Sequence, residues 1–164
     1  YTSIDHVKIP INISKNEILA RAKEKKVKIH LPSDVVCAKE FSNDAETKNF
    51  DIYNIPDDYE GMDAGKNSIE AFRKVVLDSK TILWNGPVGV FEFSNFSKGT
   101  KELGNLVAES TANGAFSLVG GGDSVAAVKK FGLQDKVSYV STGGGAMLES
   151  LEGKILPGIS ALSN

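Results

Sequence analysis

The chain has 164 residues, of which 41% are hydrophobic and 8% aromatic, enough to build the core of one globular domain. Nineteen basic against 21 acidic residues give a net charge of −2, so no global field favours nucleic acid or an anionic membrane. No apolar run reaches the roughly 18 residues of a membrane span, and no signal-peptide pattern is recognised. Any anion site must therefore be local.

The first part of the chain predicts one helix and several short strands. Residues 9–13 alternate around a proline, which indicates an edge strand. Residues 14–17 match a capping box, and the apolar stripe behind them predicts a helix. Residues 27–31 alternate apolar and polar side chains, which predicts a strand, and residues 35–38 predict a second one.

The histidines and the single cysteine give no sign of catalysis. His30 falls on the polar side of its strand pattern, so we expect it at the surface, and His6 likewise. Cys37 cannot form an internal disulfide and lies in an apolar run, which predicts a buried thiol rather than a nucleophile. A reducing compartment fits this pattern.

The middle of the chain is polar and rich in turns. Residues 39–58 contain one short apolar island around Phe50, which predicts a hairpin or another ordered excursion. Residues 59–65 predict a glycine-punctuated loop, and residues 67–77 follow with helical spacing. The dinucleotide fingerprint G-x-G-x-x-G is missing from the sequence.

A strand is predicted at residues 81–84, followed by a stiff loop at residues 85–93 that contains a proline between two glycines. Such a loop can present a fixed wall to a base or sugar. Asn85 could donate its amide to a phosphate, and Glu92 could accept hydrogen bonds from ribose hydroxyls. We expect at least two of the three nearby phenylalanines to pack in the core: Phe91, Phe93 and Phe96.

The strongest local signal is a strand, a glycine turn and a helix in succession. Residues 97–113 predict a helix, residues 116–119 an apolar strand, and three glycines at 120–122 precede Asp123 and a helix at 124–131. Amides at such a junction suit a phosphate. Asp123 would repel that anion unless a cation such as Mg²⁺ came between them, or it could simply cap the helix.

The same arrangement recurs about twenty residues later. A strand at residues 137–140 runs into glycines at 143–145 and a helix at 146–149. Two such loops on successive units of a parallel sheet lie at its carboxyl edge, where open α/β sheets bind ligands. The alternation of elements predicts an α/β, three-layer Rossmann-like fold with a mainly parallel sheet and helices on both faces. The residues themselves predict a nucleotide or phosphate site at that edge.

Several segments resemble phosphoglycerate kinase and occur in that family's order. The resemblance lies in LPSDVV at 31–36, GMDAG at 61–65, KTILWNGPVGVFE at 80–92, VGGGDS at 119–124, VSYVSTGGG at 137–145 and LESLEGKILPG at 148–158. It implies that residues 1–164 are a partial carboxyl-terminal, nucleotide-binding domain, with the amino-terminal substrate domain absent. The sequence departs from the usual family pattern at Ser33, Met62, Lys66 and Met147.

The resemblance also implies roles for particular residues. Asp123 would hold the Mg²⁺ of ADP or ATP, Asn85 would contact the phosphates, and Glu92 would bind the ribose hydroxyls. Amides facing the transferring phosphoryl group would come from Gly121, Gly122, Gly144 and Gly145. The remaining nucleotide-binding residues would be Gly61, Met62, Pro87, Gly89, Val90 and Ser124, with Gly122 also touching the nucleotide.

The implied reaction moves a phosphoryl group between 1,3-bisphosphoglycerate and ADP, giving 3-phosphoglycerate and ATP in glycolysis. The three-carbon substrate would bind the absent domain, so we expect this chain to be inactive alone, and the full-length protein to be a cytoplasmic monomer without nucleic-acid or membrane partners. Two alternatives stay open: a nucleotide-binding module without catalysis, and an unrelated Rossmann-like dehydrogenase domain, which the missing fingerprint disfavours.

Overall fold

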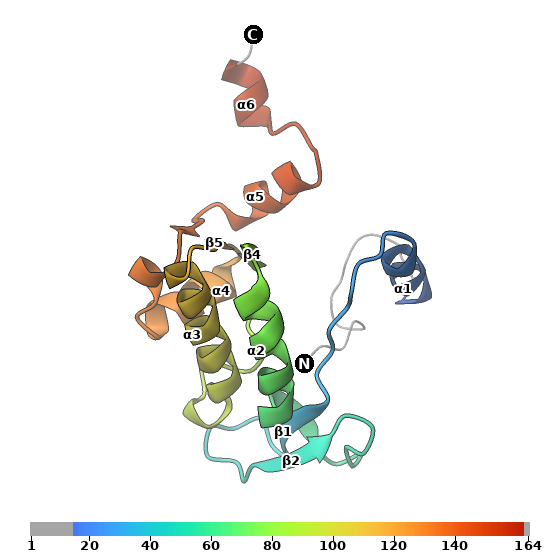
Figure 1. The fold of residues 1–164 in the computed structure, drawn as a ribbon. Helices are drawn as coiled ribbons and strands as arrows, with labels where there is room; N and C mark the ends of the chain where they lie inside the picture. Colours follow the sequence, from blue (N-terminus) through green and yellow to red (C-terminus); the bar gives the residue numbers. More distant parts are fainter. Residues whose placement is uncertain (1–14, 163–164) are drawn as a thin grey trace.

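A computed structural model describes residues 15–162 of the chain. Its strands form two three-stranded sheets, with the orders β2-β1-β3 and β4-β5-β6 (Figure 1). The first sheet is antiparallel and the second is parallel. This mixed α/β architecture with a Rossmann-like parallel sheet confirms the predicted fold class.

The antiparallel sheet includes the hairpin that was predicted for the polar residues 39–58, since β2 lies in this segment. β1 (Asp34–Ala38) pairs with β2 (Lys48–Asp51) on one side and with β3 (Glu60–Ala64) on the other. Its pairing with β3 shifts register between Val36 and Cys37. The expectation of a loop at residues 59–65 was therefore wrong, because pairing with β1 outweighs the low strand propensity of the glycines.

The parallel sheet contains the strands expected from the apolar runs. β4 (Thr81–Trp84) pairs with β5 (Phe116–Val119), and β5 pairs with the two-residue β6 (Tyr139–Val140). β6 is shorter than the predicted strand at residues 137–140. Just before it, hydrogen bonds to serine side chains replace the backbone hydrogen bonds between the strands. The amide of Ser117 donates to Oγ of Ser138, and the amide of Ser138 donates to Oγ of Ser117, both at 3.0 Å.

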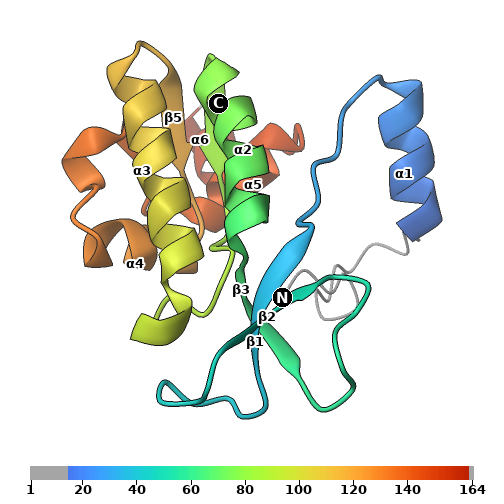
Figure 2. The same ribbon diagram turned by 60° about the horizontal axis from the view of Figure 1, so that its bottom comes forward.

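Helices α2 (Lys66–Asp78) and α3 (Lys98–Ala112) lie side by side in both ribbon views (Figures 1 and 2). The next helix, α4 (Gly122–Lys130), follows β5, and two 3₁₀ turns, η1 (Ser94–Phe96) and η2 (Gln134–Lys136), flank these elements. The largest apolar cluster joins the parallel sheet to these helices and contains Trp84, Val107, Val119, Val128, Leu133 and Val137.

Two further expectations about buried side chains are confirmed. Phe91 and Phe96 are buried, so two of the three phenylalanines do pack in the core. Cys37 is fully buried, and burial raises the pKa of its thiol. A thiol in this state is a small core residue rather than a nucleophile.

The first and last helices extend away from the two sheets. α1 (Lys15–Glu24) is separated from the rest of the fold, on the side of α2 away from α3 (Figure 1). α5 (Gly144–Leu151) and α6 (Pro157–Leu162) project beyond the parallel sheet. α1 and α5 were expected as helices, whereas the sequence analysis predicted no helix at the position of α6. Within residues 15–162, none of the helices combines the length and apolar character that crossing a bilayer requires.

The strand predicted at residues 27–31 is wrong. Lys26, in the turn that follows α1, has a φ of 56°, and the apolar side chains after it are exposed to water: Val27 is 60% exposed and Leu31 is 62% exposed. Within the described part of the chain no strand pairs with this segment, and an extended segment without a neighbour gains no ladder of hydrogen bonds. The expected edge strand at residues 9–13 and the surface position of His6 lie outside the described residues.

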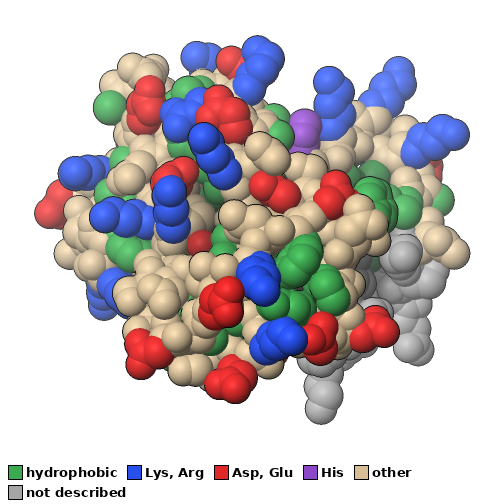
Figure 3. Space-filling model, turned by 90° about the horizontal axis from the view of Figure 1, so that it is seen from below, with side chains coloured by type: hydrophobic (Ala, Val, Ile, Leu, Met, Phe, Trp, Pro, Cys, Tyr) green, Lys and Arg blue, Asp and Glu red, His purple; other side chains and the backbone are tan. Residues whose placement is uncertain are grey.

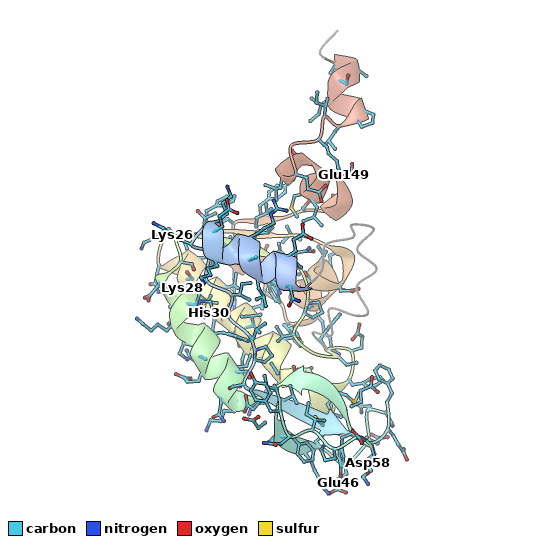
Figure 4. All side chains as sticks on the ribbon, turned by 90° about the vertical axis from the view of Figure 1, so that its right-hand side faces the viewer. Lys26, Lys28, His30, Glu46, Asp58 and Glu149 are labelled. Carbon is cyan, nitrogen blue, oxygen red and sulfur yellow. The ribbon has the colours of Figure 1, made fainter. Side chains whose placement is uncertain are left out.

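Charged groups of both signs lie on the face of the molecule that is seen from below. Acidic and basic side chains are intermixed on the face seen from below (Figure 3), so no field of one sign covers it. His30 is exposed as predicted, and Figure 4 shows it with Lys26 and Lys28 along the segment that follows α1.

Candidate functional site

The three parallel strands end at the same level. Trp84 of β4 pairs with Val119 of β5, which in turn pairs with Val140 of β6. Beyond this row, the amide of Gly120 donates to the carbonyl of Trp84 at 3.0 Å, and the amide of Ser141 donates to the carbonyl of Val119 at 2.8 Å. The loops after the three strands therefore start side by side at one edge of the sheet.

These loops touch one another at positions that have no room for a side chain. A Cβ atom on Gly121 would collide with Oδ1 of Asn85, and a Cβ atom on Gly144 would collide with the backbone of Gly121. Gly121 also has a φ of 85°, a left-handed conformation that favours glycine. Asn85, Gly121 and Gly144, three of the predicted site residues, are thus packed against each other.

Hydrogen bonds to the backbone amide and carbonyl of Gly86 hold the loop after β4 in place. Its amide donates to Oγ of Ser124 at 2.6 Å, and its carbonyl accepts from Nε1 of Trp84 at 2.9 Å. Ser124 is only 1% exposed. In this structure the predicted nucleotide-binding Ser124 therefore ties the Asn85 loop to α4.

Two helix N-termini open onto the same edge. α4 begins at Gly122 and α5 begins at Gly144, and the first amides of each helix have no acceptor within the helix. A Cβ atom on Gly122 or Gly145 would meet nothing within 4 Å, so the space beside these glycines is open. Free amides and two positive dipole ends make this edge suitable for an anion.

Asp123 lies in the first turn of α4 and is exposed. Its carboxylate accepts no hydrogen bond from any described residue, so the alternative that it caps the helix gains no support. Among residues 15–162, no three His, Cys, Asp or Glu side chains are grouped as metal ligands. One carboxylate beside a phosphate site still fits Mg²⁺, which typically takes one or two protein carboxylates together with phosphate oxygens and water.

The residues expected around the base and ribose form a second group. The amide of Val90 donates to the carbonyl of Met62 at 2.8 Å, so the loop after Pro87 runs along β3. Met62 is 1% exposed and packs with Ala38, Phe96 and Val90. The structure thus brings Met62, Gly89 and Val90 together, with the Met62 side chain in the core.

Two surface hollows lie away from the glycine loops. One, of about 520 Å³, lies between α3 and η2 and is lined by residues such as Asn105 and Lys136. The other, of about 420 Å³, borders Gly61 and is lined by Lys39 and Tyr59. Of the predicted site residues, only Gly61 lines either hollow.

The sequence reasoning missed Asp63, a buried carboxyl beneath this second group. Asp63 is 2% exposed, and its Oδ2 accepts a hydrogen bond from the amide of Gly99 at 2.7 Å. A Cβ atom on either Gly89 or Gly99 would collide with its carboxyl. Burial raises the pKa of Asp63 to about 7, against the opposing effect of the amides of Gly99 and Ala64. The sequence signal that could have indicated this residue is the presence of an aspartate within the otherwise uncharged segment GMDAG.

The reasoning also missed Lys130, at the far end of α4 from Asp123. Its Nζ donates to the carbonyls of Phe91 and Glu92, at 2.8 and 2.9 Å. Glu92 itself is exposed. A lysine near the C-terminus of a helix is common in any sequence, so the pattern gave no signal for this contact.

The family of phosphoglycerate kinases matches this chain over residues 10–154. The phosphoglycerate kinase of Porphyromonas gingivalis is 64% identical over 146 residues, which cover 89% of this chain and 35% of the relative. That of Thermosipho africanus is 54% identical over 148 residues, covering 90% of this chain and 37% of the relative. The chain thus spans little more than a third of the length of these relatives.

Solved structures agree with the sequence comparison. The phosphoglycerate kinase structure from Coxiella burnetii superposes with a TM-score of 0.84 at 47% identity, covering 90% of this chain and 37% of that one. The structure from Pyrococcus horikoshii OT3 gives a TM-score of 0.72 at 32% identity, covering 90% and 35%. The family match, the relatives and the shared fold together establish that this chain belongs to the phosphoglycerate kinase family.

Proposed function

We propose that this chain carries the nucleotide site of a phosphoglycerate kinase, in a partial carboxyl-terminal domain spanning residues 1–164. The observation that supports this most is the packing of Asn85 against Gly121 and of Gly121 against Gly144 at the ends of three aligned strands. It brings the N-termini of α4 and α5 to the same edge of the sheet, which supports the proposal that a phosphate binds there.

The proposed roles follow from this placement and from family membership. Asn85 contacts the nucleotide phosphates, and Glu92 binds the ribose hydroxyls. The base and ribose lie against the group formed by Met62, Gly89 and Val90. Gly61 and Pro87 complete this part of the proposed site. The amides of Gly121, Gly122, Gly144 and Gly145 face the transferring phosphoryl group, where fixed donors stabilise developing charge with little reorganisation.

Asp123 is the proposed protein ligand of Mg²⁺. When bound, the ion would neutralise charge on the nucleotide phosphates. The exposed position of Asp123 at the start of α4 leaves its carboxylate accessible to such an ion. Ser124, the next residue, holds Gly86 and so keeps the Asn85 loop at a fixed distance from α4.

The proposed overall reaction transfers a phosphoryl group between 1,3-bisphosphoglycerate and ADP in glycolysis, in a cytoplasmic protein that is monomeric at full length. Because the chain spans 35% of its Porphyromonas gingivalis relative, we propose that the three-carbon substrate binds a domain outside it. The chain alone then binds nucleotide without turnover. Measurable kinase activity of the isolated chain would contradict this part of the proposal.

The nucleotide site is tested by calorimetric titration of the chain with ADP, with and without Mg²⁺. We expect binding that depends on Mg²⁺ and is lost in Asp123→Asn. Asp135→Asn is the matched control, because Asp135 is another acidic residue in the first turn of a helical segment, η2, and it borders the hollow remote from the glycine loops. No binding by a folded wild-type chain, or equal loss in both variants, would overturn the proposal.

A further inference from the structure

The loop that contains Glu92 is fastened to the end of α4. Nζ of Lys130 lies 2.8 Å from the carbonyl oxygen of Phe91 and 2.9 Å from that of Glu92, and donates a hydrogen bond to each. Two consecutive carbonyls that share one ammonium group must point in similar directions. The lysine therefore fixes the orientation of the peptide that carries the Glu92 side chain.

Packing supports the same junction from the apolar side. Phe91 is 4% exposed, and its ring meets the ring of Phe131 edge-on at a centroid distance of 6.5 Å. Phe131 directly follows Lys130, so two adjacent residues at the end of α4 hold the loop. The turn is closed by the amide of Phe93, which donates to the carbonyl of Val90 at 3.0 Å.

α4 connects this junction to the other end of the nucleotide site. Asp123 lies in its first turn and Lys130 in its last, seven residues apart, which corresponds to about 10 Å along a helix axis. A single rigid helix thus fixes the proposed Mg²⁺ ligand relative to the loop proposed to bind ribose. The ammonium group also lies at the negative end of the helix dipole, which favours its charge there.

We propose that Lys130 is a positioning residue for ribose recognition: by holding the carbonyls of Phe91 and Glu92, it places the Glu92 carboxylate where the nucleotide hydroxyls bind. This inference rests on the proposed function, in which the chain binds a magnesium nucleotide. Lys130 itself touches no nucleotide in this scheme. Its effect should therefore depend on the hydroxyls that Glu92 recognises.

The test compares calorimetric affinities for Mg-ADP and for Mg-2′,3′-dideoxy-ADP, which lacks both ribose hydroxyls. We expect Lys130→Met to weaken Mg-ADP binding about fivefold, the scale of a charged hydrogen bond partly exposed to water. The affinity for the dideoxy nucleotide should change less than twofold. Lys130→Arg, which keeps a cationic donor, should recover most of the Mg-ADP affinity.

Lys129→Met is the matched control. Lys129 is exposed in the same turn of α4 and carries the same charge, but its side chain has no hydrogen bond or ion pair to a described residue. We expect this variant to bind both nucleotides like the wild type. Equal weakening in Lys129→Met and Lys130→Met would assign the effect to lost positive charge and overturn the inference.

The remaining outcomes separate the inference from the proposed function. If the wild type binds no Mg-ADP, both fail. If the wild type binds and Lys130→Met binds equally well, or loses the same factor for both nucleotides, only the positioning role fails. If Lys130→Met does not fold, Lys130→Gln provides the same comparison. When either variant is combined with Glu92→Gln, the loss of Mg-ADP binding free energy should be smaller than the sum of the two separate losses.

Discussion

The carboxylate of Asp63 accepts a 2.7 Å hydrogen bond from the amide of Gly99, in the first turn of α3. Ser97 precedes that helix without a side-chain capping bond, so the cap comes from a residue 36 positions earlier, in β3. Since the backbone of Gly89 also lies against this carboxyl, one buried group joins β3, α3 and the proposed nucleotide loop. It links the stability of the fold to the shape of the site.

Replacing Asp63 by alanine should destabilise the chain. The substitution leaves the buried amide of Gly99 without an acceptor and opens a void between two glycines, which should cost about 2 kcal/mol or more of unfolding free energy. Urea unfolding followed by circular dichroism measures the loss. Asp57→Ala, at an exposed carboxylate, should change stability by less than about 0.5 kcal/mol, and similar losses in both variants would contradict the assigned role.

The same carboxyl should make stability depend on pH. Burial raises the pKa of Asp63 to about 7 from an ordinary value of 3.8, and Glu102 adds repulsion in the same direction. The folded state then binds this proton more tightly, so the contribution is present below about pH 4 and is lost as the pH rises through 7. The unfolding free energy of the wild type, relative to Asp63→Asn, should fall between pH 5 and 7 by at most about 1.4 kcal/mol per unit. A constant difference across pH 5 to 8 would refute this prediction.

A second aspartate caps α2 in the same way, and its titration should act in the opposite direction. Asp34 of β1 accepts hydrogen bonds from the amides of Asn67 and Ser68, at 3.1 and 2.7 Å. Burial raises the pKa of Asp34, but the bonds from Ser68 and Asn67 outweigh it, so the net pKa is lowered. Its contribution is therefore present above pH 3.8 and is lost as the pH falls below it.

Asp34→Ala should lower the unfolding free energy by about 1 kcal/mol at pH 7, the usual cost of a lost cap. The difference from the wild type should shrink in acid as the wild-type carboxylate is protonated. Chemical unfolding at pH 7 and at pH 3 measures both values. An undiminished difference at pH 3 would show that the carboxylate charge is not what stabilises α2.

Local patterns in the sequence were sufficient for the elements whose partners are near in sequence or strongly apolar. The capping box placed α1, and the apolar stripes and the glycine turns placed α2, α3, α4 and the strands of the parallel sheet, all within a few residues of their observed bounds. The fold class follows from their alternation. Glycine loops after successive strands also indicated which residues would meet, as the contact of Gly121 with Gly144 shows.

Features that depend on distant partners were not visible in the sequence. Residues 27–31 have the alternation of a strand, yet alternation gives no information on whether a neighbouring strand is present. β3 contains Gly61 and the buried Asp63, which are poor strand residues until β1 pairs with them. Asp63 and Lys130 act across 36 and at least 38 positions of sequence, so their partners emerge only in the folded chain.

The two glycines that begin α5 should respond differently to the same substitution. A Cβ atom on Gly144 would collide with the backbone of Gly121, which cannot rotate away as a side chain could, whereas one on Gly145 would meet nothing within 4 Å. Gly144→Ala should therefore cost about 1–3 kcal/mol of unfolding free energy. Gly145→Ala should leave stability unchanged or raise it slightly, since alanine favours the helix. Unfolding curves of the two variants give the comparison, and equal stabilities would mean that the two glycine loops are not in contact.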